Sequence, residues 1–81
     1  MKLETEYIVL GEMIRHRREL CELSQGDLAK RVGLSRVSIA TIEAGKQRVL
    51  FHQAIKFCEV LMIPMRQVQA QIEEREKGER R

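Results

Sequence analysis

The sequence predicts an all-α fold, in which five helices form one compact domain with a helix-turn-helix. Three observations support this prediction. Good helix formers such as Glu, Lys, Arg, Leu, Ile and Ala are abundant, while Pro64 is the only proline. Apolar residues recur at the three- and four-residue spacing of helices. Serine and glycine residues stand where successive helices would begin and end.

The first two helices are expected from about Glu6 to Leu20 and from Ser24 to Gly33. Ser24 suits a helix N-cap, and Asp27 three residues later makes a weak capping box. Gly33 suits the left-handed residue that follows a helix. The inward faces are expected to consist of Leu10, Met13, Ile14 and Cys21 in the first helix and Leu28, Ala29 and Val32 in the second.

The third helix is expected to begin after Ser35, its N-cap, and to end near Gly45. Leu34, Ile39 and Ile42 are its expected inward residues. Only about three residues, one of them glycine, separate the second and third helices. This spacing is that of a helix-turn-helix, in which a short turn makes two helices cross steeply.

A loop over residues 46–50 is expected to lead into a fourth helix, from about Phe51 to Leu61, and Pro64 suits the start of a fifth. Phe57 and Val60 make the apolar surface of the fourth helix wider than one stripe, so this helix is either deeply buried or covered by a partner chain. The apolar positions at helical spacing are Phe51, Ala54, Ile55, Cys58 and Leu61, followed by Met65, Val68 and Ile72.

The chain is expected to form a single domain over residues 1–76, with a charged, flexible tail at residues 77–81. With 81 residues its core is small, which favours oligomerisation. No stretch resembles a secretory signal or spans a bilayer, so we expect a cytoplasmic protein associated with the nucleoid.

Composition argues against an enzyme, a cofactor or a metal site. Cys21 and Cys58 stand alone and are expected to be reduced, partly buried thiols. His16 and His52 lie far apart in the sequence, and no set of titratable residues has the spacing of a catalytic site. We therefore expect no catalytic residue, no cofactor and no metal ligand.

The basic residues are concentrated on one segment. Residues 15–48 carry eight basic and four acidic side chains, which suits a polyanionic partner but is also compatible with an ordinary solvated surface. The sequence contains only three aromatic residues, and two of them are assigned to the core. RNA is therefore a less favoured partner than DNA, because no platform for base stacking is expected.

The outward residues of the third helix have the chemistry of base recognition. Arg36 can bond guanine O6 and N7 together, and Val37 can meet a thymine methyl group. Ser38 and Thr41 can reach bases or phosphates. Val37 is a poor helix former, and a contact with base edges would explain it, although single exposed apolar residues are also common.

Residues 10–68 resemble the phage-repressor/Cro type (XRE family) of helix-turn-helix protein. Three pieces carry the resemblance, in order and at the family's spacing: "LSQGDLAKRVGLS", "SIATIEAGK" and "AIKFCEVLMIPMRQV". The resemblance implies a compact five-helix, lambda-repressor-like domain that binds operator DNA as a dimer. It adds no effector domain, so control would come from concentration, dimerisation or a partner protein.

The resemblance also implies roles for particular residues. Gln25 would bind phosphate with its backbone N–H and brace the base-reading residue of the third helix with its side chain. Arg18 and Glu43 would form a structural ion pair. The implied base contacts are Arg36, Val37 and Thr41, and the implied DNA backbone contacts are Gln25, Ser35, Ser38, Lys46 and Arg48.

Four residues depart from the family pattern. Arg17 replaces an apolar residue, Val49 replaces a frequent proline, and Glu22 and Met62 stand where glycine is frequent. The departures affect the end of the first helix and the entry to the fourth, and they leave the helix-turn-helix unchanged.

Two functions remain open at this stage. The first is a transcription regulator, expected to be a repressor that binds a near-palindromic operator as a homodimer, of phage, restriction–modification controller or mobile-element type. The second is a protein-interaction module, such as the antitoxin of a toxin–antitoxin pair, for which DNA binding is secondary. The expected dimer surface consists of Met65, Val68, Ile72, Phe57 and Val60, unless this stripe simply closes the monomer core.

Overall fold

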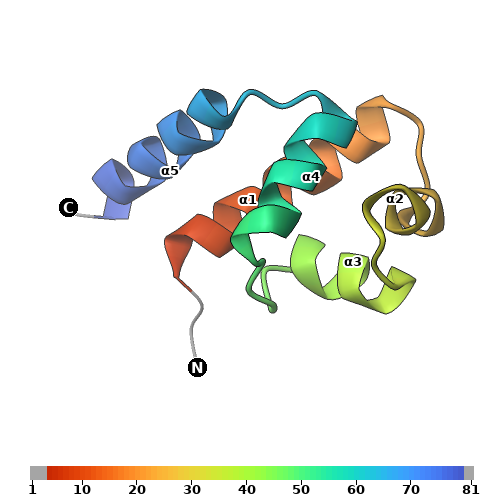
Figure 1. Cartoon of the computed structure of the whole chain (residues 1–81). Coiled ribbons are helices and arrows are strands. Elements are labelled where there is room, and N and C mark those ends of the chain that lie inside the picture. Colours follow the sequence, from red (N-terminus) through yellow and green to blue (C-terminus); the bar gives the residue numbers. More distant parts are fainter. Residues whose placement is uncertain (1–3, 80–81) are drawn as a thin grey trace.

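The computed structural model describes residues 4–79, and these residues form five helices and no strand (Figure 1). The all-α prediction is therefore confirmed. The helices are α1 (Thr5–Leu20), α2 (Gln25–Val32), α3 (Arg36–Glu43), α4 (Phe51–Leu61) and α5 (Met65–Glu79). Among the described residues, none of the helices is both long and apolar enough to cross a membrane.

The ends of α2 and the start of α3 are set by local hydrogen bonds. The Ser24 hydroxyl accepts from the backbone N–H of Asp27 at 3.0 Å, and the Asp27 carboxylate accepts from the N–H of Ser24 at 3.1 Å. These bonds to Ser24 lower the pKa of Asp27. Gly33 ends α2 with φ 74°, and the Ser35 hydroxyl caps α3 by accepting from the N–H of Ser38 at 3.1 Å. The predicted caps are thus confirmed.

Figure 1 shows α2 and α3 at one end of the molecule and α5 at the other, with α1 and α4 between them. Helix α1 contacts α3, α4 and α5, while α2 packs on α3 and α4. The approach of α1 to α3 depends on Gly11, because a side chain there would collide with the carbonyl oxygen of Ile42. The six largest fully buried side chains are Ile14, Leu28, Ile39, Ile42, Phe57 and Leu61.

Helix α4 is rotated relative to the sequence prediction. Phe51 and Ile55, which belong to the apolar positions at helical spacing, are 76 % and 39 % exposed, whereas Phe57 is fully buried. The side of α4 that faces the core is centred on Phe57, Cys58 and Leu61. A helix with apolar residues on most of its circumference can be rotated in several ways, and packing on α1 and α2 selects one of them.

The core of a single chain takes up part of the expected dimer surface. Phe57 and Val68 lie inside the core of a single chain, with 0 % and 6 % of their surface exposed. Neither side chain is open to a partner in this conformation, which favours the alternative that this part of the stripe closes the monomer core. Val60 and Ile72 are half-buried against the same core, and only Met65 of the expected set is exposed.

Helix α5 continues past the point where a flexible tail was expected. It runs to Glu79, so residues 77–79 are helical and only residues 80 and 81 of the expected tail lie outside the described part of the chain. Arg75 donates to Glu12 of α1 at 2.6 Å, which attaches the second half of α5 to α1. The abundant Glu, Lys and Arg of this segment are also good helix formers.

The departures from the family pattern are accommodated by local structure. Glu22 and Met62 both adopt a left-handed backbone conformation with φ 57°, at the ends of α1 and α4. Arg17 donates from Nε to the carbonyl oxygen of Leu61 at 2.9 Å and from Nη2 to that of Met62 at 3.3 Å. A cation at the C-terminus of α4 is favoured by the helix dipole and by unpaired carbonyl groups. Val49 is buried in the core.

Candidate nucleic-acid interface

A cluster around Glu43 fixes α3 relative to α1 and α2. Arg18 donates from Nε to Glu43 Oε2 at 2.6 Å and from Nη2 to Oε1 at 2.9 Å, and it also donates to the carbonyl of Leu23 at 2.8 Å. This is the ion pair that the resemblance implies, and its side chains are only 11 % and 3 % exposed. The hydrogen bonds to Glu43 raise the pKa of Arg18, so its guanidinium stays charged.

Gln25 joins the same cluster. Its Nε2 donates to Glu43 Oε1 at 3.1 Å, so the side chain braces the end of α3. The expectation that it would brace a base-reading residue is corrected, since Glu43 faces the interior. Gln25 is also the first residue of α2, and an α-helix leaves the N–H groups of its first turn without helical partners. Such N–H groups suit a phosphate oxygen.

The outward face of α3 presents two residues of the expected base-reading set to solvent. Arg36 is exposed, and Val37 is 72 % exposed although it is apolar. On the opposite face, Ile39 and Ile42 are fully buried and hold the helix against the core. One face of α3 is thus packed against the core and the other is exposed to solvent, as entry into a major groove requires.

Ser35 and Ser38 form a local pair at the start of α3. The Ser35 hydroxyl donates to the Ser38 hydroxyl at 3.1 Å while it accepts from the Ser38 N–H. Ser35 is therefore primarily a helix cap. Both hydroxyls lie at the positive end of α3, where an approaching phosphate would be favoured.

The loop between α3 and α4 carries the two basic residues of the expected phosphate grip. Lys46 is exposed, and Arg48 forms a two-point pair with Glu4, with Nη2–Oε1 and Nε–Oε2 separations of 2.6 and 3.1 Å. The side chains in this pair are 57 % and 47 % exposed. The bond to Arg48 lowers the pKa of Glu4, so the carboxylate is charged at neutral pH. Arg48 thus faces a carboxylate where a phosphate was expected.

Thr41, the third expected base contact, is engaged within the chain. Its Oγ1 lies 3.1 Å from the carbonyl oxygen of Val37, 3.0 Å from that of Ser38 and 2.6 Å from Oε1 of Gln47. Gln47 was not among the site residues predicted from the sequence. The available signal was a polar amide between Lys46 and Arg48, in the loop that follows the recognition helix.

Three of the other exposed apolar side chains lie at the start of α4. Leu50 is 60 % exposed, and it is followed by the exposed Phe51 and Ile55. Phe51 borders an apolar groove whose other lining residues include Tyr7, Leu10 and Ile72. No residue of α2 or α3 lines this groove. The apolar patch of Leu50, Phe51 and Ile55 lies directly after the Lys46–Arg48 loop.

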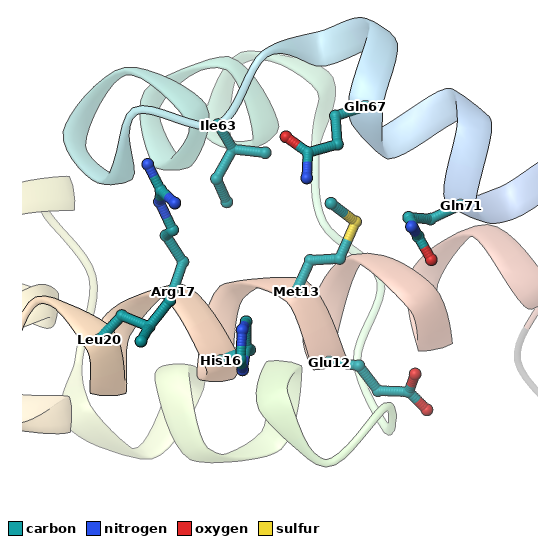
Figure 2. Close-up of a pocket in the computed structure, with 8 residues that line it drawn as sticks. All are labelled: Glu12, Met13, His16, Arg17, Leu20, Ile63, Gln67 and Gln71. Carbon is teal, nitrogen blue, oxygen red and sulfur yellow. The ribbon is translucent and has the colours of Figure 1, made fainter.

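A second groove, of about 390 Å³, runs between α1 and the start of α5 (Figure 2). Figure 2 shows Arg17 reaching toward the turn before α5, while Glu12 points away from it. Arg17 and Glu12 are occupied by backbone carbonyls and by Arg75. Three titratable side chains, Glu12, His16 and Arg17, line the groove, and two of them are engaged in these bonds. Of the two cysteines, Cys58 is buried as expected, but Cys21 is exposed, and both are free thiols.

Comparison with known proteins agrees with this geometry. A family model described as a helix-turn-helix domain matches residues 9–71, which is most of the chain. A search of curated proteins finds no similar sequence. The matched segment contains the capped α2–α3 pair, the outward face of α3 and the basic loop that follows it. The chain therefore belongs to the helix-turn-helix domain family, which indicates a DNA-binding regulator.

Proposed function

We propose that the protein is a sequence-specific transcription regulator of the phage-repressor/Cro (XRE) type, and that it acts as a repressor. It binds a near-palindromic operator as a homodimer, with α3 in the major groove. One observation carries the proposal: α3 is anchored on its inner face by Ile39, Ile42 and Glu43 and leaves Arg36 and Val37 exposed on its outer face. Arginine and a small apolar side chain are suited to guanine and to the thymine methyl group.

The proposed position on DNA uses contacts on both sides of α3. The backbone N–H of Gln25 approaches one phosphate from the N-terminus of α2. Lys46 and Arg48 approach another from the loop after α3. These contacts set orientation and carry the salt dependence, while Arg36 and Val37 supply sequence choice. Such a regulator has no catalytic step, so we propose a non-enzymatic protein that acts with DNA in the cytoplasm.

A second copy of the chain is the proposed occupant of the apolar patch at the start of α4. Two recognition helices that read an inverted repeat must lie about 34 Å apart on one side of the duplex. The apolar patch of Leu50, Phe51 and Ile55 follows the basic loop directly, so a two-fold axis beside it would keep both α3 helices on one side. Met65 and the exposed part of Ile72 would extend this surface onto α5.

An alternative function uses the same patch. If the apolar patch binds a different protein, the chain is an interaction module such as an antitoxin, and DNA binding is secondary. The 76 % exposure of Phe51 favours some protein partner, since large exposed aromatic side chains are typical of interfaces. The exposed Arg36 and Val37 on α3 favour the DNA-binding regulator.

The test is a selection of random double-stranded DNA by the purified protein near physiological salt. We expect an inverted repeat. Arg36→Ala should then relax base choice at one position per half-site by about 1–3 kcal/mol, whereas Lys46→Ala should weaken binding to all sequences alike. Recovery of only sequence-indifferent, steeply salt-dependent binding would overturn the regulator and favour the interaction module.

A further inference from the structure

The contact between Thr41 and Gln47 joins the recognition helix to the loop after it. Thr41 Oγ1 and Gln47 Oε1 are 2.6 Å apart, and both residues are half-buried. Gln47 stands between the two basic residues of the loop, Lys46 and Arg48. The contact therefore places an amide group beside the outward face of α3.

The hydroxyl proton of Thr41 is not free to be donated to DNA. A hydroxyl group has one proton, and three oxygen acceptors lie within 3.1 Å of Oγ1, belonging to Val37, Ser38 and Gln47. The proton is thus used inside the chain. Thr41 therefore has no hydroxyl proton to donate to a base, and only its oxygen lone pairs could take part in the base contact that the family resemblance implies.

The amide of Gln47 keeps both a donor and an acceptor free for DNA, whereas Thr41 has no free hydroxyl proton. A glutamine amide has two N–H donors and an oxygen with two lone pairs. Whichever end of the amide faces Thr41, one N–H donor and one oxygen lone pair remain free. A donor beside an acceptor is the pattern that recognises adenine in the major groove, through its N7 acceptor and N6 donor.

The position of Gln47 matches this chemistry. Thr41 lies one helical turn after Val37, so the two side chains share a face of α3. An amide held against Thr41 therefore lies at the C-terminal end of the face that presents Val37. Because the contact limits the rotation of Gln47 before DNA binds, less side-chain entropy is lost on binding.

We propose that Gln47 is a specificity-determining residue that recognises an adenine in each half-site, and that Thr41 is a positioning residue for its amide. This inference rests on the proposed function, because it requires α3 to occupy the major groove. It adds a base contact from outside the recognition helix and changes the role assigned to Thr41.

The test repeats the DNA selection with variants at both positions. Gln47→Ala should reduce the preference for adenine at one position of each half-site by about 5- to 150-fold. Gln47→Glu should move the preference at that position toward cytosine, because a carboxylate accepts from cytosine N4. Thr41→Val keeps the shape of the side chain but removes the hydroxyl, so it should weaken discrimination at the same position. Thr41→Ser retains the hydroxyl and should keep the discrimination of the wild type.

The controls separate the possible outcomes. Circular dichroism melting of each variant checks that α3 still folds, and Gln47 lies in a loop where its replacement should be tolerated. An inverted repeat for the wild type with unchanged selection by Gln47→Ala and Gln47→Glu overturns this inference and leaves the proposed function standing. A uniform loss of affinity at all positions also overturns it, since that is the result for a phosphate contact. Failure of the wild type to select any repeat contradicts the proposed function itself.

Discussion

At the scale of single residues, Met62 shows how this chain ends α4 without the glycine that is frequent in the family. Its backbone is left-handed, with φ 57°, which costs a residue with a Cβ roughly 1–2 kcal/mol. Arg17 compensates in part, because its guanidinium bonds the carbonyl groups of Leu61 and Met62. The side chain of Met62 is 75 % exposed and contributes little packing.

We therefore expect Met62→Gly to stabilise the fold. Relief of the left-handed strain exceeds the added flexibility of glycine in the unfolded chain, so the free energy of unfolding should rise by about 0.5–1 kcal/mol. Urea denaturation of both proteins measures the difference. Met62→Ala is the matched control, since it removes the same side chain but keeps the Cβ atom. An equal gain in both variants would mean that the side chain, and not the backbone, is responsible.

Glu4 provides a second prediction at this scale. Its carboxylate holds Arg48 by two hydrogen bonds at the proposed phosphate grip, where a phosphate oxygen would compete for the same guanidinium. Glu4→Gln should therefore increase affinity for every DNA sequence, by roughly two- to fivefold at low salt, and should make binding more salt-dependent. Fluorescence anisotropy of a labelled duplex over a salt series gives both quantities.

The control for Glu4 is another carboxylate with a similar environment. Glu12 pairs with Arg75 at 2.6 Å, and its side chain is 55 % exposed, but it contacts α5 and not the basic loop. Glu12→Gln changes the net charge of the chain by the same amount. If both variants bind DNA equally well, the gain comes from overall charge, and Glu4 does not compete with DNA for Arg48.

At the scale of helices, the sequence predicted best what local interactions decide. Ser24, Gly33 and Ser35 marked the ends of α2 and α3 correctly, because caps depend on neighbouring residues. The orientation of α4 was not predictable in the same way. Its apolar residues cover too much of the helix for periodicity to select one side, and contacts distant in sequence place Phe57 inside and Phe51 outside.

In the candidate site, too, some features follow from local spacing and others from contacts that are distant in sequence. The exposure of Arg36 and Val37 follows from the inward positions of Ile39 and Ile42, which the helical period gives. The Arg18–Glu43 pair came from the family resemblance alone. The contact of Gln47 with Thr41 and the pairing of Arg48 with Glu4 depend on the path of the loop, and no sequence period describes that path.

The Glu43 cluster supports a prediction about the packing of helices. Glu43→Gln leaves Arg18 nearly buried without a counter-charge, so the free energy of unfolding should fall by about 3 kcal/mol or more. Urea denaturation measures this loss. Because the Glu43 side chain faces the interior and fixes α3 from its inner side, the bases selected by any folded fraction should stay the same. A changed base preference would show that Glu43 also takes part in recognition.

A double variant distinguishes two causes of this loss of stability, the missing counter-charge and the missing hydrogen bonds. Arg18→Met with Glu43→Leu removes both charges and fills a similar volume, and replacement of a buried pair by apolar residues is often neutral. It should therefore recover most of the stability lost in Glu43→Gln. If the double variant is as unstable as the single one, the hydrogen bonds to Leu23 and Gln25 contribute more than the charge balance.

At the scale of the whole molecule, the proposed regulator needs two surfaces with a fixed relation. Helix α3 and the basic loop form one, and the apolar patch of Leu50, Phe51 and Ile55 forms the other. The patch begins where the basic loop ends, so the proposed dimerisation would set the spacing of the recognition helices. A chain of 81 residues has a small core, and covering this patch would also add to its stability.

The last prediction tests this coupling. The double variant Phe51→Gln with Ile55→Gln should shift the chain toward monomer in sedimentation, because it removes apolar surface that a second copy would bury. It adds no charge, so any loss of operator affinity reports on assembly and not on repulsion from phosphate.

Leu20→Gln is the control, since Leu20 is 62 % exposed and lines the groove between α1 and α5 instead. We expect this control to leave both association and binding unchanged. An unchanged dimer in the double variant would place the interface elsewhere, whereas a monomer that keeps full affinity for the inverted repeat would show that each copy binds its half-site independently.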